Sequence, residues 1–240
     1  MNPRLPHLGS VMSEPASLVA DALLFDLDGV LVDSQRAVQE AMAHWAVSVG
    51  LDPEEVLARC PGRRDVDLVR ELLPTADPAA EAAAIADIEA VRTESVVPIR
   101  GAAALLRDLG PTGWAVVTSS ARRVAQARLT AAGLPRPPLL IGAEDVPSGK
   151  PHPLPFLHAA ARLGIPPSRC IVFEDSEAGL RAADRAGMRC ISIGPTALSL
   201  GVVTVSRRDL SDVTLIRPPM GLRRFALALP ATRQVQTAKV

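Results

Sequence analysis

The sequence predicts an α/β fold, a doubly wound, Rossmann-like parallel sheet with an all-helical cap domain inserted after its first strand. Short apolar runs alternate with segments of helical periodicity through most of the chain, as βαβ units require. The interval 35–97, which follows the first apolar run, contains helical patterns and no strand pattern. We therefore assign 20–34 and 99–205 to the core and 35–98 to the cap.

The first strand is expected at 22–26, where four apolar residues precede an aspartate, a pattern typical of buried parallel strands. The first cap helix is expected to begin after Ser34, a suitable N-cap residue, and to end before Gly50. The cap helices are expected at 34–49, 53–59, 65–73 and 77–96.

After Pro98 the core resumes, and helices again alternate with short strands. Strands are expected at 114–118, 139–141, 170–173 and 189–193, and helices at 101–109, 120–132, 154–163 and 176–186. Residues 1–19 contain three prolines and are interpreted as a loose N-terminal extension. One or two weak strands are expected within 202–216, and 206–240 are interpreted as a tail that is poorly ordered beyond 216.

Composition argues against several classes of function. The 26 basic and 26 acidic residues balance, which gives no reason to expect nucleic acid or an anionic membrane as a partner. We expect neither a bilayer-spanning segment nor a signal peptide, because no apolar stretch has the required length. Cys60, Cys170 and Cys190 form no CxxC pair, so we expect no disulfide framework or zinc site, and a cytoplasmic location fits.

Acidic side chains follow two predicted strands at the edge where the carboxyl ends of parallel strands meet. Asp26 and Asp28 follow the first strand, and Glu174 and Asp175 follow the fourth. Clustered carboxylates repel one another unless a cation lies among them, and Mg²⁺ prefers such oxygen ligands. A capped turn would explain Asp26 and Asp28 taken alone, but the second acidic pair favours a metal site.

Two further segments at this edge suit phosphate. Thr118 and Ser119 end the second strand and Ser120 opens a helix, where hydroxyls and free N–H groups bind anions, although an ordinary N-cap is the alternative. Lys150 and Lys239 are the only lysines among 26 basic residues. Most basic residues of this chain are arginines, yet a lysine stands at position 150 in a loop at this edge. This suggests that position 150 requires a compact point charge, although the lysine could also have been retained there by chance.

Four segments resemble, in order, the four motifs of the haloacid dehalogenase-like hydrolase superfamily. They lie at 26–34, 116–120, 149–153 and 173–179. The resemblance covers about 20–195, and a cap placed between the first two motifs is similar to that of subclass I members.

The resemblance implies a two-step phosphoryl transfer. Asp26 is expected to attack phosphorus and form an aspartyl-phosphate, and Asp28 to protonate the leaving oxygen and then activate water. It also implies Mg²⁺ as cofactor, held by the Asp26 carboxylate, the Asp28 backbone carbonyl and Asp175, with Glu174 as ligand or support. The phosphoryl oxygens are expected to contact Thr118, Ser119 and Lys150.

Differences between this sequence and other members of the superfamily disfavour some of the reactions known in it. Asp28 disfavours dehalogenation, and the absence of lysine from the cap leaves Schiff-base chemistry unsupported. Val38 stands where β-phosphoglucomutases carry a histidine, which disfavours a mutase. We therefore expect a phosphatase for a small phosphate ester, most similar to the sugar-phosphate and glycerol-phosphate branch. A phosphomutase and a non-catalytic protein that binds phosphorylated metabolites are the alternatives.

Substrate selectivity is expected to come from the cap. Arg63, Arg64 and Asp65 follow Gly62 in a turn that suits contact with hydroxyls or a second anionic group, although a solvated loop explains them equally well. His44 is a further candidate on the first cap helix. We expect a monomer or a weak homo-oligomer.

Overall fold

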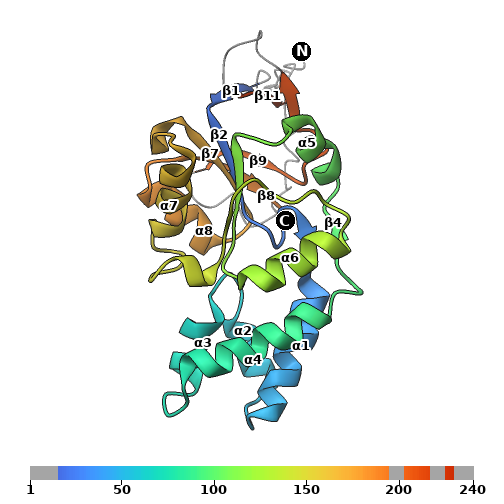
Figure 1. The fold of residues 1–240 in the computed structure, drawn as a ribbon, viewed down its shortest axis with the longest axis vertical. Coiled ribbons are helices and arrows are strands. Elements are labelled where there is room, and N and C mark those ends of the chain that lie inside the picture. Colours follow the sequence, from blue (N-terminus) through green and yellow to red (C-terminus); the bar gives the residue numbers. More distant parts are fainter. Residues whose placement is uncertain (1–15, 195–202, 217–224, 230–240) are drawn as a thin grey trace, which may run out of the picture.

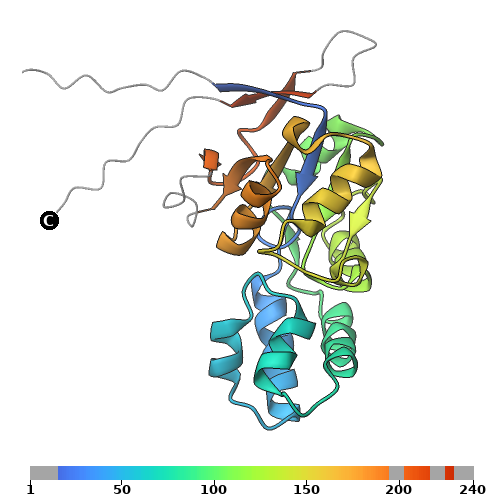
Figure 2. The same ribbon diagram turned by 90° about the vertical axis from the view of Figure 1, so that its left-hand side faces the viewer.

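The computed structural model describes residues 16–194, 203–216 and 225–229. An α/β core and a helical cap follow one another along the long axis of the molecule (Figure 1). Turning the view by 90° shows the same separation of core and cap (Figure 2). In these described ranges, no helix combines the length and apolar character that crossing a membrane requires.

The core is built on a six-stranded parallel sheet with the order β6-β5-β2-β7-β8-β9, which confirms the predicted fold class. The strand bounds are β2 Ala22–Phe25, β5 Trp114–Val117, β6 Leu140–Ile141, β7 Cys170–Glu174, β8 Arg189–Ile193 and β9 Val203–Arg207. The chain builds outward from β2 through β5 to β6 and then returns to the other side of β2 at β7. Ligands bind outside the carboxyl ends of strands at such a reversal of strand order.

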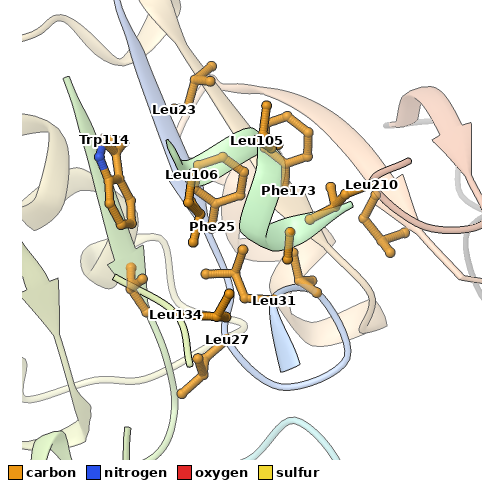
Figure 3. Packing of buried hydrophobic residues seen from close by; sticks show 14 of the residues in the cluster. Leu23, Phe25, Leu27, Leu31, Leu105, Leu106, Trp114, Leu134, Phe173 and Leu210 are labelled. Atoms are coloured by element: carbon orange, nitrogen blue, oxygen red, sulfur yellow. The ribbon is translucent and has the colours of Figure 1, made fainter. Parts of the chain in front are cut away.

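Both faces of this sheet are buried, because the side chains of each strand alternate between two apolar clusters. Leu23 and Phe25 of β2 belong to the cluster in Figure 3, and Leu24 belongs to the cluster on the other face. In the first cluster Phe25 stacks on Phe173 with ring centroids 4.5 Å apart. Helices α5 and α6 supply residues to the first cluster, and α7 and α8 to the second. Their bounds are α5 Ala102–Leu109, α6 Arg122–Ala131, α7 Leu154–Leu163 and α8 Glu177–Arg185.

The cap contains four helices around a separate apolar cluster that includes Met42, Trp45 and Ile85. Their bounds are α1 Gln35–Ser48, α2 Pro53–Arg59, α3 Asp65–Leu72 and α4 Pro78–Val91. Asp52 and Asp77 cap the helices α2 and α4, and each is followed by a proline in the first helical position. The helix predicted at 77–96 ends earlier, at Val91, because β-branched residues and Pro98 follow.

Two short strands connect the cap to the core. β3 (Val32–Asp33) and β4 (Val97–Pro98) pair antiparallel, so the chain enters and leaves the cap side by side. Because β3 begins six residues after Asp26, the cap is held over the carboxyl ends of the parallel strands. This connection places cap residues opposite the acidic residues of the core.

A second sheet differs from the prediction for both chain ends. β1 (Ala16–Ala20), part of the predicted loose extension, pairs antiparallel with β11 (Phe225–Leu229), and β10 (Thr214–Ile216) completes the order β1-β11-β10. The predicted disorder of the tail is therefore wrong for β11. This pairing joins segments some 200 residues apart, so no local pattern reveals it. Four segments lie outside the described residues: 1–15, which form the rest of the predicted N-terminal extension, and 195–202, 217–224 and 230–240.

Candidate active site

Asp26 lies at the centre of the site, just beyond the carboxyl end of β2. Its backbone N–H donates to the carbonyl of Phe173 at 2.9 Å, which continues the pairing of β2 with β7 and fixes the backbone. Its Oδ1 accepts a hydrogen bond from Lys150 Nζ at 2.7 Å. Asp26 is buried, yet it lines the cavity between core and cap, so one carboxylate face remains open to a ligand.

Glu174 organises the side of the site that belongs to β7. Its Oε1 accepts from Lys150 Nζ at 2.5 Å, and its Oε2 accepts from Asp175 N, Ser176 N and Ser176 Oγ, each at 2.9 Å. Both carboxylate oxygens are therefore occupied. Of the two roles expected for Glu174, metal ligand or support, these contacts favour support.

Three carboxylates and one ammonium group share this small volume. Ligand oxygens of Asp26, Glu174 and Asp175 all lie within 4.8 Å of one another. Burial raises the pKa of Asp26 well above its usual value, against the opposing effect of Lys150, and the carboxylates of Glu174 and Asp175 raise it further. Burial and the charge of Glu174 raise the pKa of Asp175 to about 7. A divalent cation bound to Asp26 and Asp175 would neutralise this excess negative charge, so the residues present fit Mg²⁺.

Lys150 bears a stable positive charge in this acidic environment. Burial alone would lower the pKa of Lys150, but the charges and hydrogen bonds of Asp26 and Glu174 outweigh burial and raise it. Its ammonium group also lies 5.2 Å from the ring centroid of Phe156. The side chain is thus held on two carboxylates and one aromatic ring, with its charge adjacent to the cavity.

Asp28, unlike Asp26, is held mainly from the side of α6 and the first cap helix. Its Oδ1 accepts from Ser34 Oγ at 2.5 Å, its Oδ2 accepts from Ser120 Oγ at 3.2 Å, and Arg128 Nη1 lies 2.9 Å from both oxygens. Ser34 occupies the N-cap position of α1 but makes no capping hydrogen bond. The predicted N-cap position is therefore confirmed, but the hydroxyl of Ser34 binds Asp28 instead of capping the helix.

The hydroxyl segment after β5 lies at the same end of the cavity. Thr118 is buried, and its N–H donates to the carbonyl of Ile141 at 3.0 Å, while its Oγ1 accepts from Ser120 N at 3.1 Å. Ser119 Oγ donates to the carbonyl of Gly62 in the cap at 3.2 Å. The structure therefore brings the predicted phosphate-binding residues to the acidic cluster, around a cavity of about 1000 Å³.

The predicted cap residues fall into two groups. Gly62 and Arg63 line the cavity, although Arg63 pairs with Glu71 at 2.9 Å. Arg64 does not line the cavity, because its guanidinium donates to Asp67 and to backbone carbonyls of the core loop 143–147. His44 is exposed on the surface of α1 and contacts Arg92, so its predicted substrate role is also unsupported.

Comparison with known proteins agrees with this geometry. The sequence profile of the family described as haloacid dehalogenase-like hydrolase matches residues 23–193. The chain belongs to this family. It is 41% identical over 205 residues to hexitol phosphatase A of Escherichia coli (strain K12), covering 82% of this chain and 95% of that protein. It is 34% identical over 196 residues to glycerol-1-phosphate phosphohydrolase 2 of Saccharomyces cerevisiae, covering 77% and 78%.

Solved structures of haloacid dehalogenase-like proteins share the fold. A β-phosphoglucomutase from Clostridium difficile superposes with a TM-score of 0.69 and 21% identity, over 80% of this chain and 92% of that one. The predicted family and the prediction of an enzyme of the hydrolase class are confirmed. The chain is an enzyme with phosphatases among its curated relatives.

A buried arginine that the motifs do not indicate links the core to the cap. Arg128 of α6 is 1% exposed; besides Asp28, its Nη1 donates to Ser120 Oγ at 2.9 Å and its Nη2 donates to Glu89 Oε1 of the cap helix α4 at 2.7 Å. On the sequence, Arg128 lies among other arginines of a helix, and Glu89 lies in an Ala- and Glu-rich helix. Nothing local distinguishes either residue, because their importance comes from tertiary contact.

Replacing Arg128 with glutamine is expected to lower the free energy of unfolding by about 3–5 kcal/mol, because Asp28 and Glu89 lose their shared buried partner. Arg123→Gln is the matched control. Arg123 joins the same two helices by pairing with Asp87 at 2.8 Å, but this pair is largely exposed and contributes about 0–1 kcal/mol. Urea unfolding of both variants measures the difference. Equal losses of unfolding free energy in the two variants would show that the buried ion pairs of Arg128 stabilise the protein no more than the exposed pair of Arg123.

Gly29 is required because Asp175 occupies the space of a side chain there. Its φ is +79°, and a Cβ at this position would lie 1.9 Å from Asp175 Oδ2. Gly29→Ala is therefore expected to displace Asp175 and weaken Mg²⁺ binding by about 10-fold or more. Gly50→Ala is the control, since Gly50 has φ +75° and no atom within 4 Å of its Cβ position. Calorimetric Mg²⁺ titration should show normal affinity in this control, and equal affinity in both variants would contradict the assignment of Asp175.

Proposed function

We propose that this enzyme is a Mg²⁺-dependent phosphatase that hydrolyses the phosphate monoester of a small sugar or polyol through an aspartyl-phosphate on Asp26. The observation that supports it most is the pairing of a buried aspartate with Lys150 beside Asp175, at the reversal point of a parallel sheet. Relatives named as hexitol and glycerol-1-phosphate phosphatases support the substrate class.

The first half of the proposed reaction moves the phosphoryl group to the protein. An Asp26 oxygen attacks phosphorus, the bond to the ester oxygen breaks, and the departing alcohol takes a proton from Asp28. Lys150 and the hydroxyl of Thr118 are available to the phosphoryl oxygens, and Ser119 is expected to contact them by exchanging its hydrogen bond to the carbonyl of Gly62. Mg²⁺ bound at Asp26 and Asp175 supplies further charge neutralisation for the transferring group.

In the second half, water is the acceptor. Asp28 takes a proton from water, the oxygen of that water attacks phosphorus, and the bond to the Asp26 oxygen breaks to release inorganic phosphate. Val38 lines the cavity on the cap side, so an apolar side chain stands where the mutases of the superfamily carry a histidine. This residue favours hydrolysis over transfer of the phosphoryl group to a second sugar.

A panel of phosphate esters tests the substrate class. Phosphate release is measured with a hexitol phosphate, glycerol 1-phosphate and fructose 1-phosphate, beside nucleoside monophosphates and phosphocholine, each with Mg²⁺ and with a chelator. We expect turnover of the first group only, and only with Mg²⁺. Turnover confined to nucleotides or phosphocholine would contradict the sugar or polyol assignment. Sugar-phosphate isomerisation that depends on a hexose bisphosphate, without phosphate release, would establish the mutase alternative.

The stability gained from Mg²⁺ is expected to depend on pH. Because the folded protein raises the pKa of Asp175 to about 7, it binds this proton more tightly than the unfolded chain between about pH 4 and pH 7. Without metal, stability therefore falls as pH rises through this window. Mg²⁺ requires the ionised carboxylate and should raise the melting temperature by about 5–10 °C at pH 8 and a hundredfold excess over Kd, and much less at pH 5.

Thermal melts of two variants check this expectation. Asp175→Asn should remove the gain from Mg²⁺, and Asp184→Asn, at an exposed position of the neighbouring helix α8, should retain it. An equal gain at both pH values in the wild-type protein would contradict the role given to Asp175.

A further inference from the structure

The cap presents to the cavity a carboxylate that has no partner. Asp65 is the first residue of α3 and lines the cavity together with Glu89. In the part of the chain that the structure describes, no hydrogen bond or ion pair engages the Asp65 side chain. Burial raises the pKa of Asp65 well above its usual value and the charge of Glu89 adds to the effect, which Arg128 opposes. Because the Asp65 side chain is partly exposed to the cavity and has no partner among the described residues, its oxygens are free to accept hydrogen bonds from a ligand.

The basic side chains around the cavity are already paired, in contrast to Asp65. Of the described residues, four basic side chains line this cavity. Lys150 and Arg128 have the carboxylate partners given above, Arg63 pairs with Glu71, and Arg181 pairs with Glu177. Lys150 lies at the end that receives the phosphate. At the cap end, a second anionic group of a substrate would face Asp65 and Glu89 without a free cation.

We propose that Asp65 determines specificity by accepting hydrogen bonds from hydroxyl groups of the substrate, and that it excludes esters with a second anionic group. This inference rests on the proposed phosphatase activity and deepens it. Hydroxyl groups satisfy a carboxyl oxygen without bringing charge, whereas a carboxylate or second phosphate would face two acidic side chains, Asp65 and Glu89, and no unpaired cation among the described residues. A neutral polyhydroxylated chain therefore fits the cap end, and the phosphate fits the end formed by Asp26, Thr118 and Lys150.

The first test compares two substrates on one variant. Asp65→Ala is expected to lower kcat/KM for a hexitol phosphate by about 10–100-fold, because the hydroxyls lose their acceptor. For p-nitrophenyl phosphate, which has no hydroxyl group, kcat/KM should stay within about threefold. Asp87→Ala is the control, because Asp87 is an exposed cap acid on α4 outside the cavity, and both substrates should behave as with wild type. Equal losses on both substrates with Asp65→Ala would overturn the proposal, as would an unchanged rate on the hexitol phosphate.

The second test reverses the charge. Asp65→Arg is expected to raise kcat/KM for phosphoglycolate, which carries a carboxylate beside its phosphate, relative to the hexitol phosphate by about 10-fold or more. Asp65→Asn retains an acceptor oxygen and should keep the wild-type ratio more closely than the other two. If the alanine variant does not fold, these two variants decide, and an Arg variant with the wild-type substrate ratio sinks the proposal.

Different results would contradict the proposed function and the proposed role of Asp65. A wild-type protein without Mg²⁺-dependent phosphate release, or one unaffected by Asp26→Asn, contradicts the proposed function itself. An active wild-type enzyme whose Asp65 variants keep the wild-type substrate ratios contradicts only the role of Asp65.

Discussion

Asp26→Asn is expected to lower the rate of phosphate release from p-nitrophenyl phosphate by a factor on the order of 10⁴ or more, because the amide cannot act as the nucleophile. The substitution preserves the shape of a buried residue fixed by β2 and Lys150, so the loss should appear in kcat rather than KM. Initial rates with and without Mg²⁺ measure it.

Asp184→Asn serves as the control for that experiment. Asp184 is exposed on α8, and its replacement should leave the rate within about twofold of wild type. Melting temperatures of both variants exclude unfolding as the cause. Wild-type activity in the Asp26 variant would mean that another group attacks phosphorus.

Lys150→Met is expected to have the second largest effect, since it removes a cation that contacts both Asp26 and Glu174. Leaving these carboxylates unpaired should cost about 3–5 kcal/mol of unfolding free energy in the metal-free protein. The loss of a fixed charge beside the phosphoryl oxygens should lower kcat by about 10²–10³-fold. Urea unfolding and steady-state kinetics measure the two effects.

Two substitutions control for charge and position. Lys150→Arg keeps the charge but replaces a compact ammonium with a wider fork in a buried site, so activity should recover only in part. Arg185→Met removes an exposed cation that donates to the carbonyl of Pro151, and it should change stability by about 1 kcal/mol or less. Full activity in the Lys150→Met variant would show that Lys150 has no role in the reaction.

The fold and the core of the site could be predicted from the sequence because local sequence patterns indicate them. Strands such as β2 and β7 are continuous apolar runs, as burial on both faces requires. Each strand ends in polar residues, and parallel topology brings those ends together. The positions of Asp26, Thr118, Lys150 and Asp175 around one cavity follow from that topology.

The remaining features depend on contacts between distant segments. Arg128 and Glu89 meet across 39 residues, and β1 meets β11 across most of the chain, so periodicity indicates neither contact. The sequence could not separate Arg63, which lines the cavity, from Arg64, which turns to the core loop. The direction of a side chain at a cap turn depends on the packing of cap against core. For the same reason the sequence could not distinguish Asp65 from the two arginines of that turn.

The most direct test of the account is to identify where the phosphoryl group resides during turnover. The enzyme is mixed with Mg²⁺ and a hexitol phosphate, quenched in acid within one turnover, digested, and analysed by mass spectrometry. We expect a phosphate on Asp26, in the peptide containing the loop after β2, and none in the Asp26→Asn variant. Phosphate release without any phosphorylated Asp26, or with the phosphate on another residue, would contradict it.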